Sequence, residues 1–189
     1  TDSDDTDMAS FSFTITPTDI KDGANEILNV GGNAYALNAD LTKTNVNIGG
    51  TNFDIAYVAS TGKFTITETA SGEMPKAALN ALIQGVSYQN DKGEPTAGTR
   101  TITYLTNDGD ANSNSPTSTI TVAVVNDVPV IDLDVADTTT RNFSATFTEG
   151  DATAVKVTKS DASVTDSDDT DMASFSFTIT PTDIKDGAN

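Results

Sequence analysis

The stretch that decides the fold is Ser10-Phe11-Ser12-Phe13-Thr14-Ile15-Thr16, in which apolar and polar side chains alternate without interruption. A period of two places Phe11, Phe13 and Ile15 on one face of an extended strand and the hydroxyl side chains on the other. Pro17 then introduces a turn. The stretch therefore predicts a strand with one buried face.

The same alternation recurs along the chain in short segments separated by Gly, Asn, Asp and Pro turn signals. Further strands are predicted at residues 26–30, 46–48, 53–57, 63–67, 99–105, 118–124, 131–133, 143–148 and 154–157. One segment differs, because Leu79, Leu82, Ile83 and Val86 have the i, i+3, i+4, i+7 spacing of a helix. The pattern predicts an all-β sandwich with one short helix at 75–84.

Composition excludes several classes of function. The 189 residues carry 28 acidic and 10 basic side chains, a net charge of −18, which argues against nucleic acid or an anionic membrane as a partner. No apolar run is long enough for a spanning helix, so direct membrane insertion is not expected. The sequence contains no His and no Cys, which removes imidazole acid–base chemistry, thiol nucleophiles and disulfides.

Residues 165–189 repeat residues 1–25 without a change, at an offset of 164 residues. This identity predicts a tandem array, with a duplication made in cloning as the alternative. Because the chain starts without Met, we expect an excised fragment of that array. The expected domains are a sandwich module at 1–127, then a linker and the first strands of the next repeat at 128–189. Identical copies favour a role set by length or valency, and an enzyme is not expected.

The acidic residues are 23 Asp and 5 Glu, and many of the Asp residues form short clusters. Ca²⁺ takes six to eight oxygen ligands, and an Asp-x-Asp loop supplies several of them over a short length of backbone. The clusters are Asp2, Asp4 and Asp5, their copies Asp166, Asp168 and Asp169, and the pair Asp108 and Asp110, with a weaker stretch at Asp132, Asp134 and Asp137. The alternative is that these side chains only bond their own turn backbone. That ordinary role is expected for Asp19, Asp22, Asp40, Asp54 and Asp91.

Four segments together carry a resemblance to a known family. They are Phe147-Thr148-Glu149-Gly150-Asp151, Val164-Thr165-Asp166-Ser167-Asp168-Asp169, Asn107-Asp108-Gly109-Asp110 and Val125-Asn126-Asp127-Val128-Pro129-Val130. Their order resembles the cadherin-like (Ig-like) extender repeats of giant bacterial RTX-type adhesins. The resemblance implies an Ig-like, cadherin-like Greek-key sandwich that is secreted by a type I system and displayed on the bacterial cell surface. The chain lacks the glycine-rich nonapeptide repeats of the wider family, so the secretion route follows from the resemblance alone.

The resemblance also implies which residues bind Ca²⁺. At the upstream pole it groups the loop of Asp2, Asp4 and Asp5 with Asp108 and Asp110. At the downstream pole it sets Asn126 and Asp127 opposite Asp166, Asp168 and Asp169, and it assigns Glu149 to the downstream site of its own module. The implied partners are neighbouring identical repeats in the same chain.

The expected function is therefore that of a Ca²⁺-stiffened spacer that projects a distal adhesive domain. The alternatives are a carbohydrate- or ice-binding module and a Ca²⁺-independent surface-layer repeat. In the cadherin order, residues 143–164 would complete the 1–127 sandwich, within one chain or by strand exchange between chains. Alternatively, the module begins near Thr1 and is complete, with 129–189 forming a smaller second unit.

Overall fold

A computed structural model describes residues 7–70 and 72–184 of the chain. It divides the chain into two compact units, Thr1–Val124 and Val125–Asn189, each of which is described separately below. The division falls three residues before the boundary expected from the sequence, at the start of the Asn- and Pro-containing linker.

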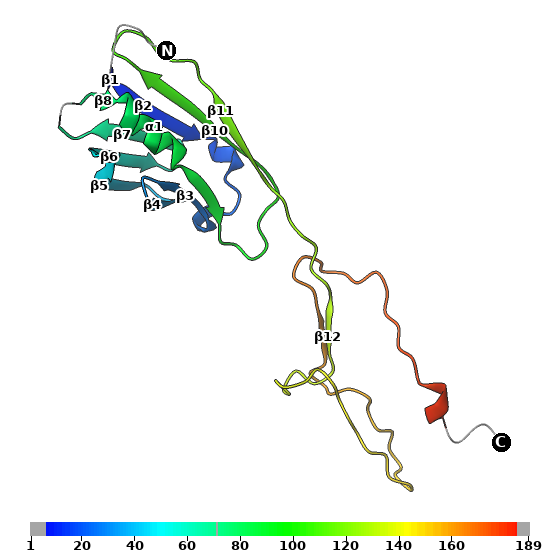
Figure 1. The fold of residues 1–189 in the computed structure, drawn as a ribbon. Coiled ribbons are helices and arrows are strands. Elements are labelled where there is room, and N and C mark those ends of the chain that lie inside the picture. The colour runs from blue at the N-terminus through cyan, green and yellow to red at the C-terminus, as the bar shows by residue number, and fades with distance from the viewer. Residues whose placement is uncertain (1–6, 71, 185–189) are drawn as a thin grey trace. The chain divides into compact units, whose positions relative to one another are not determined.

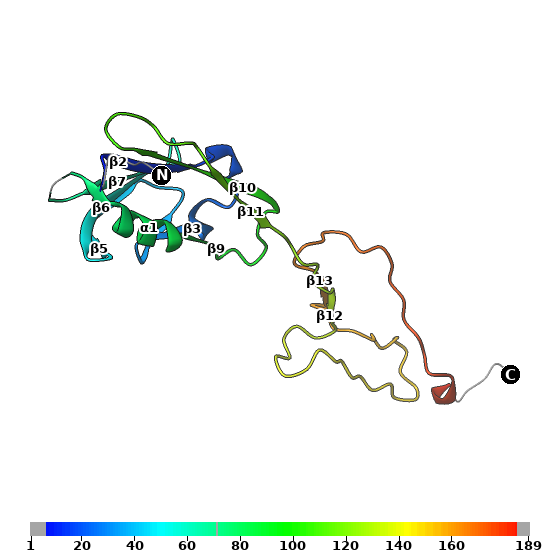
Figure 2. The same ribbon diagram turned by 45° about the horizontal axis from the view of Figure 1, so that its top comes forward.

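The first unit is a sandwich of two antiparallel sheets (Figures 1 and 2). The larger sheet has the order β11-β10-β2-β7-β6-β5, and the smaller has the order β4-β3-β9. The strands of the larger sheet are β2 (Ser10–Ile15), β5 (Leu41–Ile48), β6 (Thr51–Val58), β7 (Lys63–Glu68), β10 (Gly98–Asn107) and β11 (Thr117–Val122). Those of the smaller sheet are β3 (Glu26–Val30), β4 (Asn33–Ala36) and β9 (Ser87–Asn90). The all-β sandwich predicted from the sequence is confirmed.

Short elements complete this unit. A small antiparallel pair joins β1 (Asp7–Met8) to β8 (Met74–Pro75), and two 3₁₀ turns, η1 (Pro17–Asp19) and η2 (Gly23–Asn25), lead from β2 to β3. The predicted helix is confirmed as α1 (Lys76–Gln84), which buries Leu79 and Leu82 and leaves Ile83 39% exposed. Within the described part of the chain, no helix is both long and apolar enough to cross a membrane.

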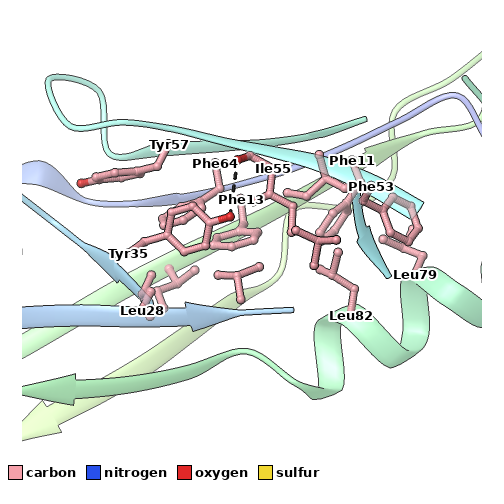
Figure 3. Close-up of a cluster of buried hydrophobic side chains, with 14 of the residues drawn as sticks. Phe11, Phe13, Leu28, Tyr35, Phe53, Ile55, Tyr57, Phe64, Leu79 and Leu82 are labelled. Carbon is pink, nitrogen blue, oxygen red and sulfur yellow. Dashed lines mark hydrogen bonds between the residues drawn. The ribbon is translucent and has the colours of Figure 1, made fainter. Parts of the chain in front are cut away.

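The core between the sheets is rich in aromatic rings (Figure 3). Phe64 on β7 stacks on Phe13 with ring centroids 4.6 Å apart and on Tyr57 at 4.4 Å, and Tyr35 meets it edge-on at 5.3 Å. The Tyr57 hydroxyl donates a 2.9 Å hydrogen bond to the Leu37 carbonyl, which satisfies its polar end inside the core. Burial raises the pKa of Tyr35 and Tyr57 to about 12.

The β6–β7 hairpin requires glycine at its turn, as the segment Ser60-Thr61-Gly62 predicts. Gly62 has φ +65°, and a Cβ built on it would lie 1.9 Å from the Ile15 carbonyl oxygen. The close approach lets the Ile15 amide donate a 2.9 Å hydrogen bond to the Gly62 carbonyl. The hairpin turn and the end of β2 are therefore held together by backbone contact.

The second unit contains much less regular structure. β12 (Val130–Asp132) pairs with β13 (Ser163–Thr165), and a 3₁₀ turn, η3 (Pro181–Asp183), lies near the end of the described residues. The predictions of strands at 143–148 and 154–157 are wrong, because neither segment is a strand. Phe147 is 62% and Val157 83% exposed, so no sheet among residues 7–70 and 72–184 covers these two side chains.

We predict that Phe13→Ala lowers the free energy of unfolding by about 3–5 kcal/mol, because it opens a cavity beside Phe64. The repeat supplies a matched control, Phe177→Ala, at a copy of the same position that is 80% exposed. The control should change stability by no more than about 0.5 kcal/mol. Urea unfolding can be followed through the four Tyr residues, which all lie in the first unit. Equal losses in the two variants would contradict the assigned burial.

Candidate metal centre

The carboxylates of Asp166, Asp168 and Asp169 converge in the turn that follows β13. One oxygen from each lies within 4.8 Å of the others. Among the described residues, this is the one group of three or more acidic side chains close enough to share an ion. The β12–β13 pairing positions it, because Thr165 is the last paired residue and the turn begins at the next one.

Local hydrogen bonds shape this turn. Asp166 Oδ1 accepts the backbone N–H groups of Asp168 and Asp169 at 3.3 and 3.4 Å. These bonds fold the backbone back on itself, as Asp side chains commonly do in turns. They bring the side chains of the Asp-x-Asp-Asp motif to one side of a short loop.

The linker reaches the same cluster within the second unit. The Asp127 backbone N–H donates a 3.2 Å hydrogen bond to Asp168 Oδ2. The Asn126 side-chain amide donates to the carbonyl of Asp127. Asp127 therefore contacts the cluster through its backbone amide, and Asn126 bonds the carbonyl of its neighbour Asp127. The carboxylate of Asp127 is not part of the group of three.

Two of these carboxyl groups, those of Asp166 and Asp168, interact directly. A hydrogen bond shared between the carboxyl groups of Asp166 and Asp168 lowers the pKa of Asp166 and raises that of Asp168. A proton on Asp168 thus offsets part of the repulsion between neighbouring negative charges. A divalent cation would do the same more effectively, and it would bind best once that proton has left. Three carboxylates supply up to six oxygens, a set that suits Ca²⁺.

Among the described residues, the predicted ligands Asp108, Asp110 and Glu149 are not part of this group of three. Asp108 and Asp110 lie in the β10–β11 loop of the first unit, where Asp108 Oδ1 accepts the amides of Asp110 and Ala111 at 2.9 and 2.7 Å. Glu149 lies in an exposed turn, and among the described residues it belongs to no group of three or more side chains that could share a metal ion. Asp2, Asp4 and Asp5 lie outside the described residues.

The weaker stretch at Asp132, Asp134 and Asp137 is engaged in other contacts. Asp134 forms a 3.0 Å ion pair with Lys159. Asp137 accepts hydrogen bonds from the hydroxyl and backbone of Thr139, which lower its pKa to about 2. The ordinary turn role that the sequence left open describes Asp137 and also Asp132, whose Oδ1 accepts the Asp134 amide at 3.0 Å, but it does not describe the ion-paired Asp134.

A buried charge cluster in the first unit was missed by sequence reasoning. Arg100 on β10, fully buried, donates to Glu26 Oε1 on β3 through Nε at 2.9 Å and Nη2 at 2.5 Å. Asp22 lies beside them, with its Oδ2 3.6 Å from Arg100 Nη2 and its Oδ1 2.8 Å from Lys92 Nζ. The prediction that Asp22 has only an ordinary turn role is wrong, because its buried side chain accepts hydrogen bonds from Lys92 and Thr96.

The charges in this cluster compensate one another. Burial raises the pKa of Asp22, but hydrogen bonds from Lys92, Thr96 and Asn90 outweigh that effect and hold it well below its usual value. Two carboxylates are matched by two cationic side chains, so their charges balance and the cluster does not call for a metal. A lone Glu on a strand and a lone Arg more than seventy residues away gave no signal of this pairing in the sequence.

Comparison of the chain with protein-family models, with curated proteins and with solved structures found no match.

We predict that Asp22 makes the first unit acid-sensitive. The pKa of Asp22 is lower folded than unfolded, so its stabilising contribution is complete above the unfolded value of about 3.9 and is lost as pH falls below it. Asp22→Asn should lower stability at pH 7 by about 1–3 kcal/mol and flatten the decline towards pH 3. The control is Asp40→Asn, at an exposed residue. Urea midpoints at both pH values provide the measurement, and parallel pH profiles for Asp22→Asn and wild type would disprove the assignment.

Proposed function

We propose that this chain is a Ca²⁺-stabilised extender repeat of a bacterial surface adhesin, a spacer that holds a distal binding domain away from the cell. The observation that carries the proposal is the hydrogen bond from the Asp127 amide to Asp168, which joins the linker to the one acidic cluster in the described residues. An ion held there would fix the linker to the start of the following repeat.

The physical argument concerns stiffness. A linker without a bound ion samples many conformations, and an array of such joints folds back on itself. A cation shared by the carboxylates of Asp166, Asp168 and Asp169 would restrict the turn to which the linker is bonded. Extracellular modules bind Ca²⁺ with Kd of about 10⁻⁴–10⁻³ M, which suits a site built largely from exposed side chains. Neighbouring repeats are the proposed partners and the bacterial exterior the proposed location, with no enzymatic activity.

A cavity in the first unit favours a ligand-binding module as a second candidate. It measures about 600 Å³ and lies between α1 and the loop that joins β10 to β11. Amide and hydroxyl groups of Asn80, Asn112 and Ser113 line it beside the apolar Met8 and Leu79. Its described lining includes no aromatic ring on which a sugar could stack, so this candidate is the weaker one.

We predict that the full chain binds Ca²⁺ and that Asp168→Asn weakens binding at least tenfold, because it removes a central charge of the cluster. The matched control is Asp183→Asn, which removes one exposed charge elsewhere in the same unit and should leave binding unchanged. Affinity should fall as the pH is lowered through the raised pKa of Asp168. Calorimetric titration measures all three effects, and equal heats from wild type and Asp168→Asn would refute the site.

We predict that Ca²⁺ also stiffens an array. Small-angle scattering of an array of two or more 164-residue periods should show a longer maximum dimension in Ca²⁺ than in EGTA. The array carrying Asn at the positions of Asp166, Asp168 and Asp169 should keep its EGTA dimensions in both buffers. Identical scattering of the wild-type array with and without Ca²⁺ would rule out the spacer mechanism even if binding were observed.

A further inference from the structure

One sequence occupies two different environments in this molecule. Residues 7–20 and 171–184 are identical. In the first copy Phe11, Phe13 and Ile15 are 2%, 1% and 0% exposed. In the second copy, the same three side chains, Phe175, Phe177 and Ile179, are 69%, 80% and 64% exposed. Because the sequences do not differ, the partners alone account for the difference.

The first copy shows which partners the sequence takes. β2 lies between β10 and β7, with Phe13 opposite Tyr104 on one side and Phe64 on the other. The Thr16 amide donates to the Thr101 carbonyl at 3.0 Å. Asp19, in the turn after β2, accepts the Thr101 amide at 3.0 Å. The space between β7 and β10 is therefore a slot that this sequence fills with both its backbone and its side chains.

The second copy already has part of the required local structure. η3 repeats η1, and Thr180 before it has φ −62° and ψ 120°, close to the −59° and 116° of Thr16. Met172 and Phe175 border an apolar cavity of about 340 Å³, and the rest of its apolar face is exposed. In the described part of the chain, residues 174–179 pair with no strand (Figures 1 and 2).

We propose that residues 174–179 are a donor strand that docks between β7 and β10 of a second copy of this chain whose own β2 has left the slot. The docked strand takes the register of β2, which places Phe177 opposite Phe64 on one side and Tyr104 on the other. Asp183 then accepts a hydrogen bond from the Thr101 amide, as Asp19 does in the intact chain. The slot of an intact chain is filled by its own β2, which is why the accepting copy must have a vacant one. Within the described residues the donor has no sheet pairing to give up when it docks.

The experiment mixes two full-length chains. The acceptor carries Phe13→Asp and Phe177→Asp, so neither of its copies can fill the slot. The donor is the wild-type chain, whose own slot stays filled while its second copy is exposed. Mixing should give a one-to-one complex of twice the 19.6 kDa chain mass and should restore the folded Tyr signal of the acceptor. A Phe177→Asp chain is the matched control donor, and it should neither form the complex nor restore the folded Tyr signal of the acceptor.

Cross-linking tests the register of the docked strand, and it does not require the acceptor to fold in the absence of the donor. The chain has no Cys, so two can be introduced cleanly. Ser12 pairs with Thr65, and Ser176 is the copy of Ser12. A donor with Ser176→Cys should therefore form a disulfide with an acceptor that also carries Thr65→Cys, and a donor with Thr180→Cys should form at least tenfold less. No rescue by wild type, equal rescue by the control donor, or equal cross-linking by both donors would overturn the proposal.

Discussion

The position of β2 between β7 and β10 is the constraint on which the first unit depends. Phe13 on this strand stacks on Phe64, which also contacts Tyr35 and Tyr57, so the strand anchors the aromatic centre of the core. The same residues in the second copy form no strand, although their alternation is identical. Whether this segment forms a strand thus depends on neighbouring strands that pair with it. The local sequence pattern determines only which face of the strand is buried.

The two sheets are further fixed by charge. Glu26 belongs to the smaller sheet and Arg100 to the larger, so their buried ion pair crosses the sandwich. A buried pair of this kind contributes little net stability compared with apolar side chains, but a mismatched one is strongly unfavourable. A slip of β3 or β10 by one residue would turn one of the two side chains to the other face and leave its partner buried and unpaired. The ion pair therefore specifies the strand register, whereas the aromatic core supplies stability.

The sequence predicted the strands whose apolar residues alternate and the helix with its i, i+3, i+4 spacing. It missed β4 and β9, because Asn-Ala-Tyr-Ala and Ser-Tyr-Gln-Asn each contain one large apolar side chain and show no period. It wrongly predicted strands near Phe147 and Val157, where the alternation is present but, in the part of the chain that the structure describes, no neighbouring strand pairs with it. The structure shows the three carboxylates of the Asp-x-Asp-Asp motif close together, while their binding of Ca²⁺ stays a prediction. The burial of Asp22 could not be predicted, since Lys92 and Thr96 reach it from about seventy residues away.

The proposed ion site and the proposed donor strand lie close together in sequence. Only four residues, 170–173, separate Asp169, the last member of the cluster, from Ser174. Ordering one residue costs about 1–2 kcal/mol of backbone conformational entropy. A segment that an ion already holds at one end has fewer conformations, so it loses less entropy when its other part docks into a sheet. By the same reasoning, a docked strand would restrain the loop that carries the three carboxylates and favour ion binding. The repeated 25-residue segment would then act as a single joint, in which the metal site and the strand stabilise each other through the short stretch of chain between them.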